Sequence, residues 1–141
     1  MKRILFIFIL FIFPFSLTLA ASPSSKLTTI AQIDLRAVHA GQVMEQPLTL
    51  QNTGDAVLEI SSITSDCPCT TFWHPGKDGK YQPLLPESAI TILPGDIVLI
   101  KLIFDSNKTK YQGVFKKLII ICSNDPGVPI KRVEMAGQLI P

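Results

Sequence analysis

The three cysteines of this chain, together with one nearby histidine, are the side chains whose types and spacing could support chemistry. Cys67 and Cys69 are separated by Pro68, and His74 lies five residues past Cys69. A disulfide between residues two apart closes a small, strained ring, and strain makes a disulfide easier to reduce and suited to redox exchange. Two thiolates beside an imidazole also suit Cu(I) or Zn(II), so Cys67, Cys69 and His74 are candidate metal ligands.

A structural disulfide is the third possibility, and it is the one that we expect. Cys122 lies in an apolar run, and a bond to it from Cys67 or Cys69 would fasten their loop to the rest of the domain. An odd number of cysteines leaves one thiol over, and Cys122 also fits the pattern of a small buried apolar residue. The disulfide candidates are therefore Cys67, Cys69 and Cys122, with redox exchange and metal binding as open alternatives.

Residues 1–20 have the pattern of a secretory signal peptide, which decides the redox compartment of these thiols. A basic start precedes an apolar run over 4–15, and small residues favour cleavage after Ala20 or Ala21. The run is shorter than the ~20 apolar residues of a comfortable spanning helix, so an uncut membrane anchor is the weaker alternative. We expect a periplasmic or secreted protein with no integral membrane span after cleavage, in a compartment where thiols tend to be oxidised.

The charge of the mature chain argues against an anionic partner. The full sequence has 13 Lys and Arg residues against 11 Asp and Glu residues, and the leader contains two of the basic ones, Lys2 and Arg3. Cleavage therefore leaves a neutral chain, which gives no electrostatic reason to expect nucleic acid as a partner.

The pattern of apolar residues after the leader predicts an all-β domain. Apolar side chains recur with a period of two, which is typical of half-buried strands, and Gly, Pro, Asn and Asp mark turns between them. We expect a flexible lead-in over 21–28, then an immunoglobulin-like antiparallel β-sandwich over 29–141, with an irregular insert at 64–88. About seven strands are expected, with the second and third forming a hairpin: 29–38, 43–52, 56–63, 89–93, 97–105, 114–123 and 130–139.

Five short motifs follow one another along this domain: Leu50-Gln51-Asn52-Thr53-Gly54-Asp55, Ser65-Asp66-Cys67-Pro68-Cys69-Thr70, Leu93-Pro94-Gly95-Asp96, Gly113-Val114-Phe115-Lys116-Lys117 and Ser123-Asn124-Asp125. In this order they resemble the bacterial family called domain of unknown function 1573, over about 33–140. The resemblance implies an exported immunoglobulin-like fold, related to Hydin-type modules that generally hold other proteins, and it implies no established reaction. The chain departs from the family pattern at Asp66, at Pro68 in place of glycine, and in a proline-rich insert over 72–87.

The sequence favours a binding function over catalysis. It shows no nucleophile motif, phosphate-binding loop or paired carboxylates in a defined context, so no catalytic residue and no cofactor is expected apart from the copper or zinc alternative above. We therefore expect a non-enzymatic binding or scaffolding module of the bacterial cell envelope. Its partner would be another envelope protein or a peptide, which could bind by adding a strand to a sheet edge.

Overall fold

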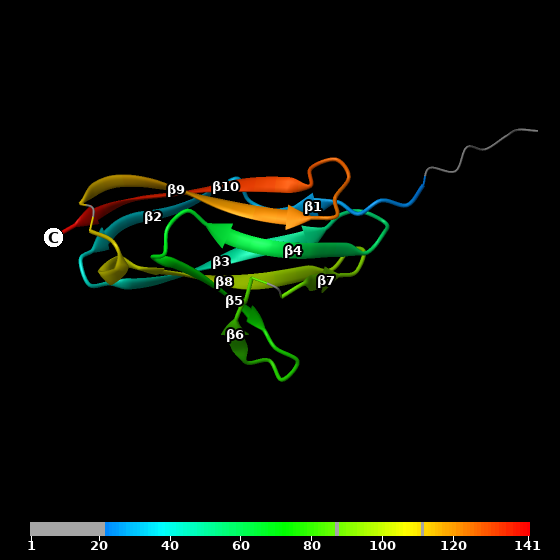
Figure 1. Cartoon of the computed structure of the whole chain (residues 1–141), viewed down its shortest axis with the longest axis horizontal. Coiled ribbons are helices and arrows are strands. Elements are labelled where there is room, and N and C mark those ends of the chain that lie inside the picture. Colours follow the sequence, from blue (N-terminus) through cyan, green and yellow to red (C-terminus); the bar gives the residue numbers. More distant parts are fainter. Residues whose placement is uncertain (1–21, 87, 111) are drawn as a thin grey trace, which may run out of the picture.

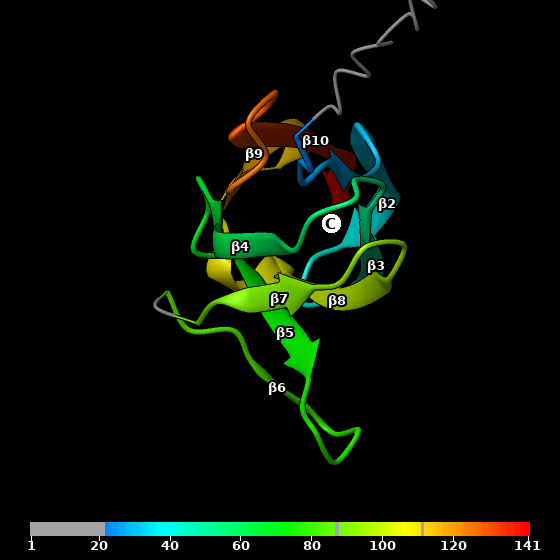
Figure 2. The same ribbon diagram turned by 90° about the vertical axis from the view of Figure 1, so that its right-hand side faces the viewer.

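The computed structural model describes residues 22–86, 88–110 and 112–141, and the leader with its cleavage site at Ala20 or Ala21 lies outside these residues. The described residues form ten strands in two five-stranded sheets and one short 3-10 helix, η1 (Ser106–Lys108). In the end-on view, one sheet curves from β2 over β10 and β9 to β4, and the other closes the opposite side (Figure 2). The all-β sandwich architecture is therefore confirmed.

Sheet A contains the hairpin that projects from the molecule. Its strand order is β1-β3-β8-β5-β6, and all of its pairs are antiparallel. The strands are β1 (Leu27–Thr28), β3 (Val43–Asn52), β8 (Ile97–Asp105), β5 (Thr70–Pro75) and β6 (Tyr81–Pro83).

Sheet B contains a parallel pair, which the expected antiparallel sandwich did not include. Its strand order is β2-β10-β9-β4-β7, and β2 runs parallel to β10 with a register shift opposite Ala136 and Gln138. The shift coincides with Arg36, whose φ of 56° bends β2 locally. The strands are β2 (Gln32–His39), β10 (Ile130–Ile140), β9 (Gly113–Ser123), β4 (Leu58–Ser65) and β7 (Ile90–Ile92).

The core lies between the sheets and is built from alternate residues of each long strand. On β8, Ile100, Leu102 and Phe104 are buried, while Val98 packs partly against the core. On β3 the same alternation buries Leu48 and Leu50 and leaves Met44 half-buried against the core. Sheet B contributes buried residues from all five of its strands: Leu35, Val38, Leu58, Ile60, Ile92, Ile119, Ile121, Val133, Met135 and Leu139. These inward-facing positions agree with the period of two in the sequence.

The hairpin expected between residues 43–52 and 56–63 is wrong. β3 pairs with β1 and β8 in sheet A, whereas β4 pairs with β7 and β9 in sheet B. Packed sheets lie about 10 Å apart, and the segment between β3 and β4 crosses from one sheet to the other. A turn signal gives the position where the chain changes direction, but it does not say whether the next strand joins the same sheet.

The side chain of Asn52 holds this crossing in place. Asn52 is fully buried at the end of β3, and its Nδ2 donates to the carbonyl oxygens of Ala56 at 2.8 Å and Ile92 at 3.0 Å. Its Oδ1 accepts from the backbone N–H of Gly54 at 3.0 Å and of Lys26 at 3.4 Å. One amide therefore joins β3 of sheet A to β7 of sheet B, to the crossing segment and to the residues before β1.

The expectation of a flexible lead-in over 21–28 is wrong for its described part. The carbonyl oxygen of Ser24 accepts from the backbone N–H of Asp55 at 3.0 Å, and that of Lys26 accepts from Thr53 at 2.9 Å. The next two residues form β1. The polar composition of the segment does not prevent this docking, because backbone groups make most of the contacts.

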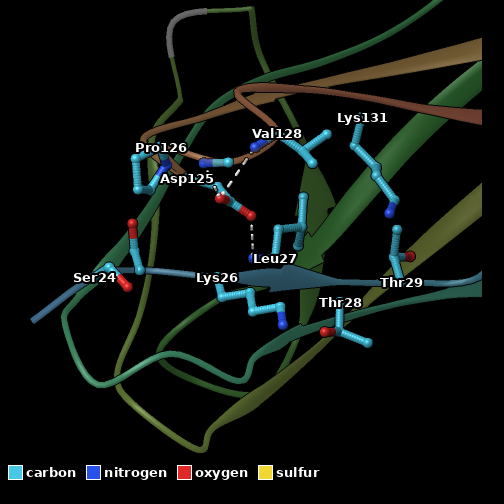
Figure 3. A pocket seen from close by; sticks show the side chains of 11 residues that line it. Ser24, Lys26, Leu27, Thr28, Thr29, Asp125, Pro126, Val128 and Lys131 are labelled. Carbon is cyan, nitrogen blue, oxygen red and sulfur yellow. Dashed lines mark hydrogen bonds between the residues drawn. The ribbon is translucent and has the colours of Figure 1, made fainter. Parts of the chain in front are cut away.

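Asp125 fixes the lead-in from the other side, in a hollow of about 460 Å³ shown in Figure 3. Its carboxylate accepts from the backbone N–H of Leu27 at 2.8 Å, of Gly127 at 2.8 Å and of Val128 at 3.2 Å. Burial by itself raises the pKa of Asp125, but the three N–H donors and the charge of Lys26 outweigh it and hold the pKa below 3.8.

The segment over 64–88 is not irregular throughout, because it contains β5 and β6. The run from Thr70 to Trp73 is rich in residues that favour strands, and it pairs with β8. Gly76 and Gly79 then turn the chain into β6, so that the hairpin projects from the sandwich (Figures 1 and 2). Pro75 ends β5 and Pro83 ends the edge strand β6, where proline is tolerated, whereas Pro68 and Pro86 lie in the connections outside the strands.

In the part of the chain that the structure describes, no helix is long and apolar enough to cross a membrane.

Replacing Asn52 by Ala is expected to lower the free energy of unfolding by at least about 2 kcal/mol, because each buried group left without a partner costs about 1 to 3 kcal/mol. Urea unfolding monitored by circular dichroism measures this change. Gln32→Ala, at an exposed position of β2, is the matched control and should stay within about 0.5 kcal/mol of the wild type. Equal effects of the two substitutions would contradict the role of Asn52.

The lowered pKa of Asp125 predicts a loss of stability in acid. Because its ordinary value is 3.8 and the folded value is lower, the carboxylate stabilises the fold above the unfolded pKa, and this contribution is lost as the pH falls through the folded pKa. Urea unfolding from about pH 6 to about pH 2 should therefore show a shallower decline for Asp125→Asn than for the wild type. An unchanged slope would show that the three N–H donors do not favour the charged form.

Candidate functional site

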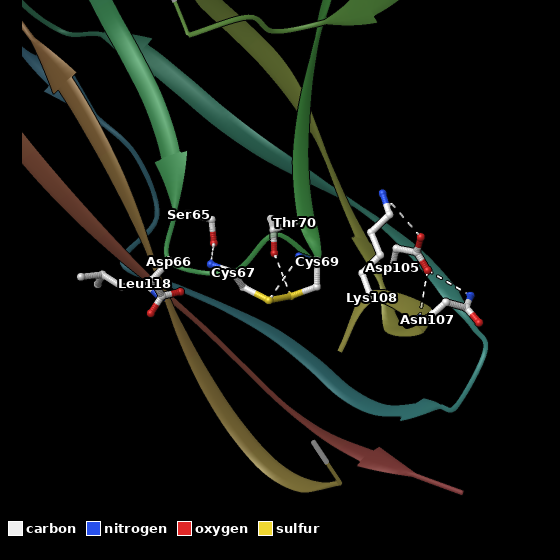
Figure 4. Close-up of a disulfide and its surroundings, with 9 residues drawn as sticks. All are labelled: Ser65, Asp66, Cys67, Cys69, Thr70, Asp105, Asn107, Lys108 and Leu118. Atoms are coloured by element: carbon white, nitrogen blue, oxygen red, sulfur yellow. Dashed lines mark hydrogen bonds and ion pairs between the residues drawn. A yellow bond between two sulfur atoms is a disulfide. The ribbon is translucent and has the colours of Figure 1, made fainter. Parts of the chain in front are cut away.

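The Cys67-Pro68-Cys69 segment connects the two sheets at the disulfide end of the sandwich, which we define by these residues, η1 and Leu118. Cys67 and Cys69 form a disulfide with their Cα atoms 5.1 Å apart (Figure 4). β4 precedes the segment in sheet B, and β5 follows it in sheet A. The small-ring alternative of the sequence analysis is therefore the one that the structure contains.

Hydrogen bonds hold the segment in place on both sides. The backbone N–H of Asp66 donates to the carbonyl oxygen of Leu118 at 3.2 Å, and the Leu118 N–H donates to Asp66 Oδ1 at 3.1 Å. On the other side, the N–H of Asp105 donates to the carbonyl oxygen of Cys69 at 2.8 Å. Asp66, which departs from the family pattern, thus extends the β4–β9 pairing up to the first cysteine.

The two sulfur-bearing residues have different surroundings. Cys67 is 7% exposed and lines a hollow of about 350 Å³, whereas Cys69 is 1% exposed and does not line it. The backbone N–H of Cys69 donates to Cys67 Sγ at 3.3 Å, and Thr70 Oγ1 lies 3.8 Å from Cys69 Sγ. The other residues that line the hollow are Asp66, Pro68, Lys108, Thr109, Lys110 and Lys117.

The expected disulfide from Cys67 or Cys69 to Cys122 is wrong. Cys122 lies near the end of β9, opposite Ser62 on β4 and Ile130 on β10, and within the described residues it forms no disulfide. It is four residues beyond Leu118, which lies beside Asp66, and four residues of strand span roughly 13 Å. Its side chain is half-buried, so it is not the small buried apolar residue that the sequence offered as an alternative.

The structure does not bring His74 to the cysteines. His74 lies near the far end of β5, opposite Gln82 of β6, and five residues of strand separate it from Cys69 by roughly 16 Å. Among the described residues, no group of three His, Cys, Asp or Glu side chains is arranged to hold a metal ion. The proposed ligand set for copper or zinc is therefore not assembled in this structure.

The outer face of sheet A is a second candidate site, which the sequence analysis missed. Ile97 and Leu99 of β8 are 56% and 47% exposed, and Tyr81 of β6 is 39% exposed. Pro47, Lys101 and Trp73 are paired neighbours across β3, β8 and β5, on the same side as these residues. The signal was present in residues 97–104, because apart from Lys101 this run is apolar at both alternating sets of positions. Such a run predicts a strand with two apolar faces.

The open edge of β3 disfavours the addition of a further strand. β1 pairs only with Gln51 and Asn52, so most of β3 has no partner strand on that side within the described chain. Thr29 Oγ1 donates to the Thr49 carbonyl at 2.7 Å from this side. The backbone groups of residues two apart in a strand point to the same edge, so the nitrogen of Pro47 also faces this edge. Proline has no N–H, and it cannot donate a hydrogen bond to an added strand.

The other edges carry similar protection. β2 bends at Arg36, and Asp34 Oδ1 accepts from the Arg36 N–H at 2.8 Å. β1, β6 and β7 are only two or three residues long. Short edges, bends and charged residues are the usual means by which sheets avoid pairing with other chains, so the outer face of sheet A is the better candidate surface for a partner.

Comparison with solved structures shows the same fold in several proteins. A protein of unknown function from Porphyromonas gingivalis W83 is 21% identical, with a TM-score of 0.68 over 86% of this chain and 50% of that chain. The ASH/PapD-like domain 7 of human CEP192 is 16% identical, with a TM-score of 0.57 over 87% of this chain and 91% of that chain. A family 123 glycoside hydrolase from Clostridium perfringens is 7% identical, with a TM-score of 0.59 over 79% of this chain and 23% of that chain.

These identities are low enough that the likeness shows the fold alone. The chain spans half the length of the Porphyromonas protein, so no property of that whole protein is assigned to this chain. No curated protein matches the chain significantly.

A family model agrees with the motifs of the sequence. Asn52 and Asp125 join the crossing and lead-in segments at one end, and Asp66 and Cys69 fix the strand ends at the other. The model described as "Protein of unknown function (DUF1573)" matches residues 28–139, which include all five motifs. The chain therefore belongs to the DUF1573 family.

Proposed function

We propose that this chain is an exported, non-enzymatic binding module of the bacterial cell envelope, and that it holds another envelope protein on the outer face of sheet A. The observation that carries the proposal is the exposure of Ile97, Leu99 and Tyr81 on one continuous sheet surface. Contiguous apolar patches on the surface of a small domain are a common sign of a protein interaction site.

The charges on this face are balanced within the chain. Lys101 Nζ lies 3.0 Å from Glu45 Oε2 and 4.7 Å from the centre of the Tyr81 ring. Both charged groups are partly exposed, so the pair adds little to stability, but it leaves no net charge for a partner to neutralise. The face therefore suits an apolar, uncharged protein surface.

The projecting hairpin shapes the face into a shallow groove. Tyr81 of β6 forms one wall, and Pro47, Leu99 and Lys101 lie across from it around a hollow of about 260 Å³. Aromatic side chains give large contact areas for little loss of conformational entropy, and they are enriched at the centres of interfaces. Tyr81 and Trp73 are the two residues that we expect to contribute most to binding.

Two further features support export and a role other than catalysis. A disulfide is typical of a protein that lives outside the reducing cytoplasm, which agrees with the leader pattern of the sequence. Two carboxyl groups have a lowered pKa, and both are engaged in local hydrogen bonds. Hydrogen bonds from the Asn107 side chain and backbone lower the pKa of Asp105, and Asp125 accepts the hydrogen bonds that hold the lead-in. Neither is tuned to exchange a proton near neutral pH.

A photo-crosslinking amino acid placed at Leu99 tests the proposal in the intact envelope. We expect a discrete adduct with one envelope protein, identified by mass spectrometry, and no such adduct from the same group at Gln138, an exposed position on sheet B. Leu99→Glu, which puts a charge on the apolar face, should weaken binding of the purified partner by about tenfold, or about 1.4 kcal/mol.

The stability of the Leu99→Glu protein serves as the control, since an exposed substitution should change the free energy of unfolding by no more than about 0.5 kcal/mol. Equal labelling from Leu99 and Gln138, or undiminished binding by Leu99→Glu, would rule out this face as the contact surface.

A further inference from the structure

We propose that the disulfide end carries a second activity, in which the Cys67–Cys69 disulfide oxidises a dithiol of a partner protein. Cys67 is the sulfur that the partner attacks, and Cys69 is the sulfur that leaves. The reaction is stoichiometric, with one chain oxidising one dithiol, and it is independent of binding at the outer face of sheet A.

Access distinguishes the two sulfurs. Thiol–disulfide exchange needs a thiolate to reach one sulfur of the bond, and the choice of sulfur fixes the products. Both cysteines are buried, but Cys67 lines the hollow of about 350 Å³ at the disulfide end, whereas Cys69 does not. An incoming thiolate therefore meets Cys67 first.

The charges around the hollow favour an attacking anion. Lys108, Lys110 and Lys117 line it together with a single carboxylate, that of Asp66. Lys108 Nζ also lies 3.8 Å from Asp105 Oδ2. Nearby lysines stabilise thiolates relative to thiols, so the hollow attracts the reactive form of the partner and stabilises Cys67 once it is reduced.

Each sulfur also has a neighbouring group that can donate a hydrogen bond when it becomes a thiolate. The backbone N–H of Cys69 already donates to Cys67 Sγ at 3.3 Å. The Thr70 hydroxyl, 3.8 Å from Cys69 Sγ, is placed to donate to the leaving sulfur. Stabilising the leaving thiolate speeds exchange, because the rate depends on how readily that sulfur departs.

The exchange proceeds in two balanced steps. A thiolate of the partner attacks Cys67 Sγ, a mixed disulfide forms, and the Cys67–Cys69 bond breaks, with its electron pair leaving on Cys69, which takes a proton from water. The second thiolate of the partner then attacks the partner's own sulfur in the mixed disulfide and releases Cys67 as a thiolate. The partner dithiol loses two electrons to become a disulfide, and the chain gains them as two thiols.

The scaffold keeps the two thiols together after reduction. Asp66 is hydrogen-bonded to Leu118 on one side through its backbone N–H and its carboxylate, and the Cys69 carbonyl is hydrogen-bonded to Asp105 on the other, and none of these bonds involves the sulfurs. The segment therefore remains held at both ends when the disulfide opens. A ring across two residues can form again without rearrangement of the sheets.

The wild-type protein provides the first test. It is incubated with reduced glutathione and quenched with N-ethylmaleimide, and the modified cysteines are then located by fragmentation mass spectrometry. We expect glutathione on Cys67 and N-ethylmaleimide on Cys69, with the circular dichroism of the fold retained. Glutathione on Cys69, or a disulfide that opens only when the protein unfolds, would overturn the proposal.

Single-thiol variants provide the second test, in a Cys122→Ser background. We expect the Cys67 thiol of Cys69→Ser to react with glutathione disulfide about tenfold faster than the Cys69 thiol of Cys67→Ser. Lys110→Ala should slow this reaction but leave the reaction with neutral hydroxyethyl disulfide unchanged, whereas Lys131→Ala, at the opposite end, should affect neither. Equal rates for the two thiols, or no effect of Lys110→Ala on the anionic probe, would contradict the assigned roles.

Discussion

The buried amide of Asn52 is the constraint on which the arrangement of the two sheets depends. A polar side chain without exposure must find partners for its donors and acceptors, or the fold loses stability. Asn52 finds them on β7, on the segment that crosses between the sheets and before β1. The requirement therefore favours an arrangement in which these segments meet at one end of the sandwich. Within the described residues, no buried side-chain nitrogen or oxygen lacks a partner.

The family motifs divide between the two ends of the sandwich, and the apolar core lies between them. Asn52 and Asn124 lie at one end, where Gly54 packs so closely against the backbone of Ser24 that a side chain has no room. Asp66 and the disulfide lie at the other end. The core needs only apolar residues of suitable size, whereas the ends need particular hydrogen-bonding groups at particular positions. This difference explains why the recognisable motifs are polar and short.

Much of the fold could be predicted from the sequence, because long half-buried strands leave a clear period of two. The strands over 97–105 and 130–139 were found in this way. Pairing could not be predicted, since the period fixes which side chains face inward but not which strand lies alongside. The expected hairpin was wrong and the parallel β2–β10 pair was missed for this reason. The strand β5 was missed for another reason, because its short run lies within a segment rich in proline and glycine. The disulfide to Cys122 was predicted wrongly because strand pairing was unknown: the distance from Cys67 to Cys122 depends on where β9 lies.

The parallel pair of β2 and β10 also determines how the domain responds to tension. The described chain begins beside Asn52 at one end, and the C-terminus lies at the other (Figure 1). β2 and β10 run side by side in the same direction between these ends. A pull on the two termini therefore slides one strand along the other and loads their backbone hydrogen bonds together, rather than opening them one at a time. The domain therefore resists extension along this axis through the whole β2–β10 ladder.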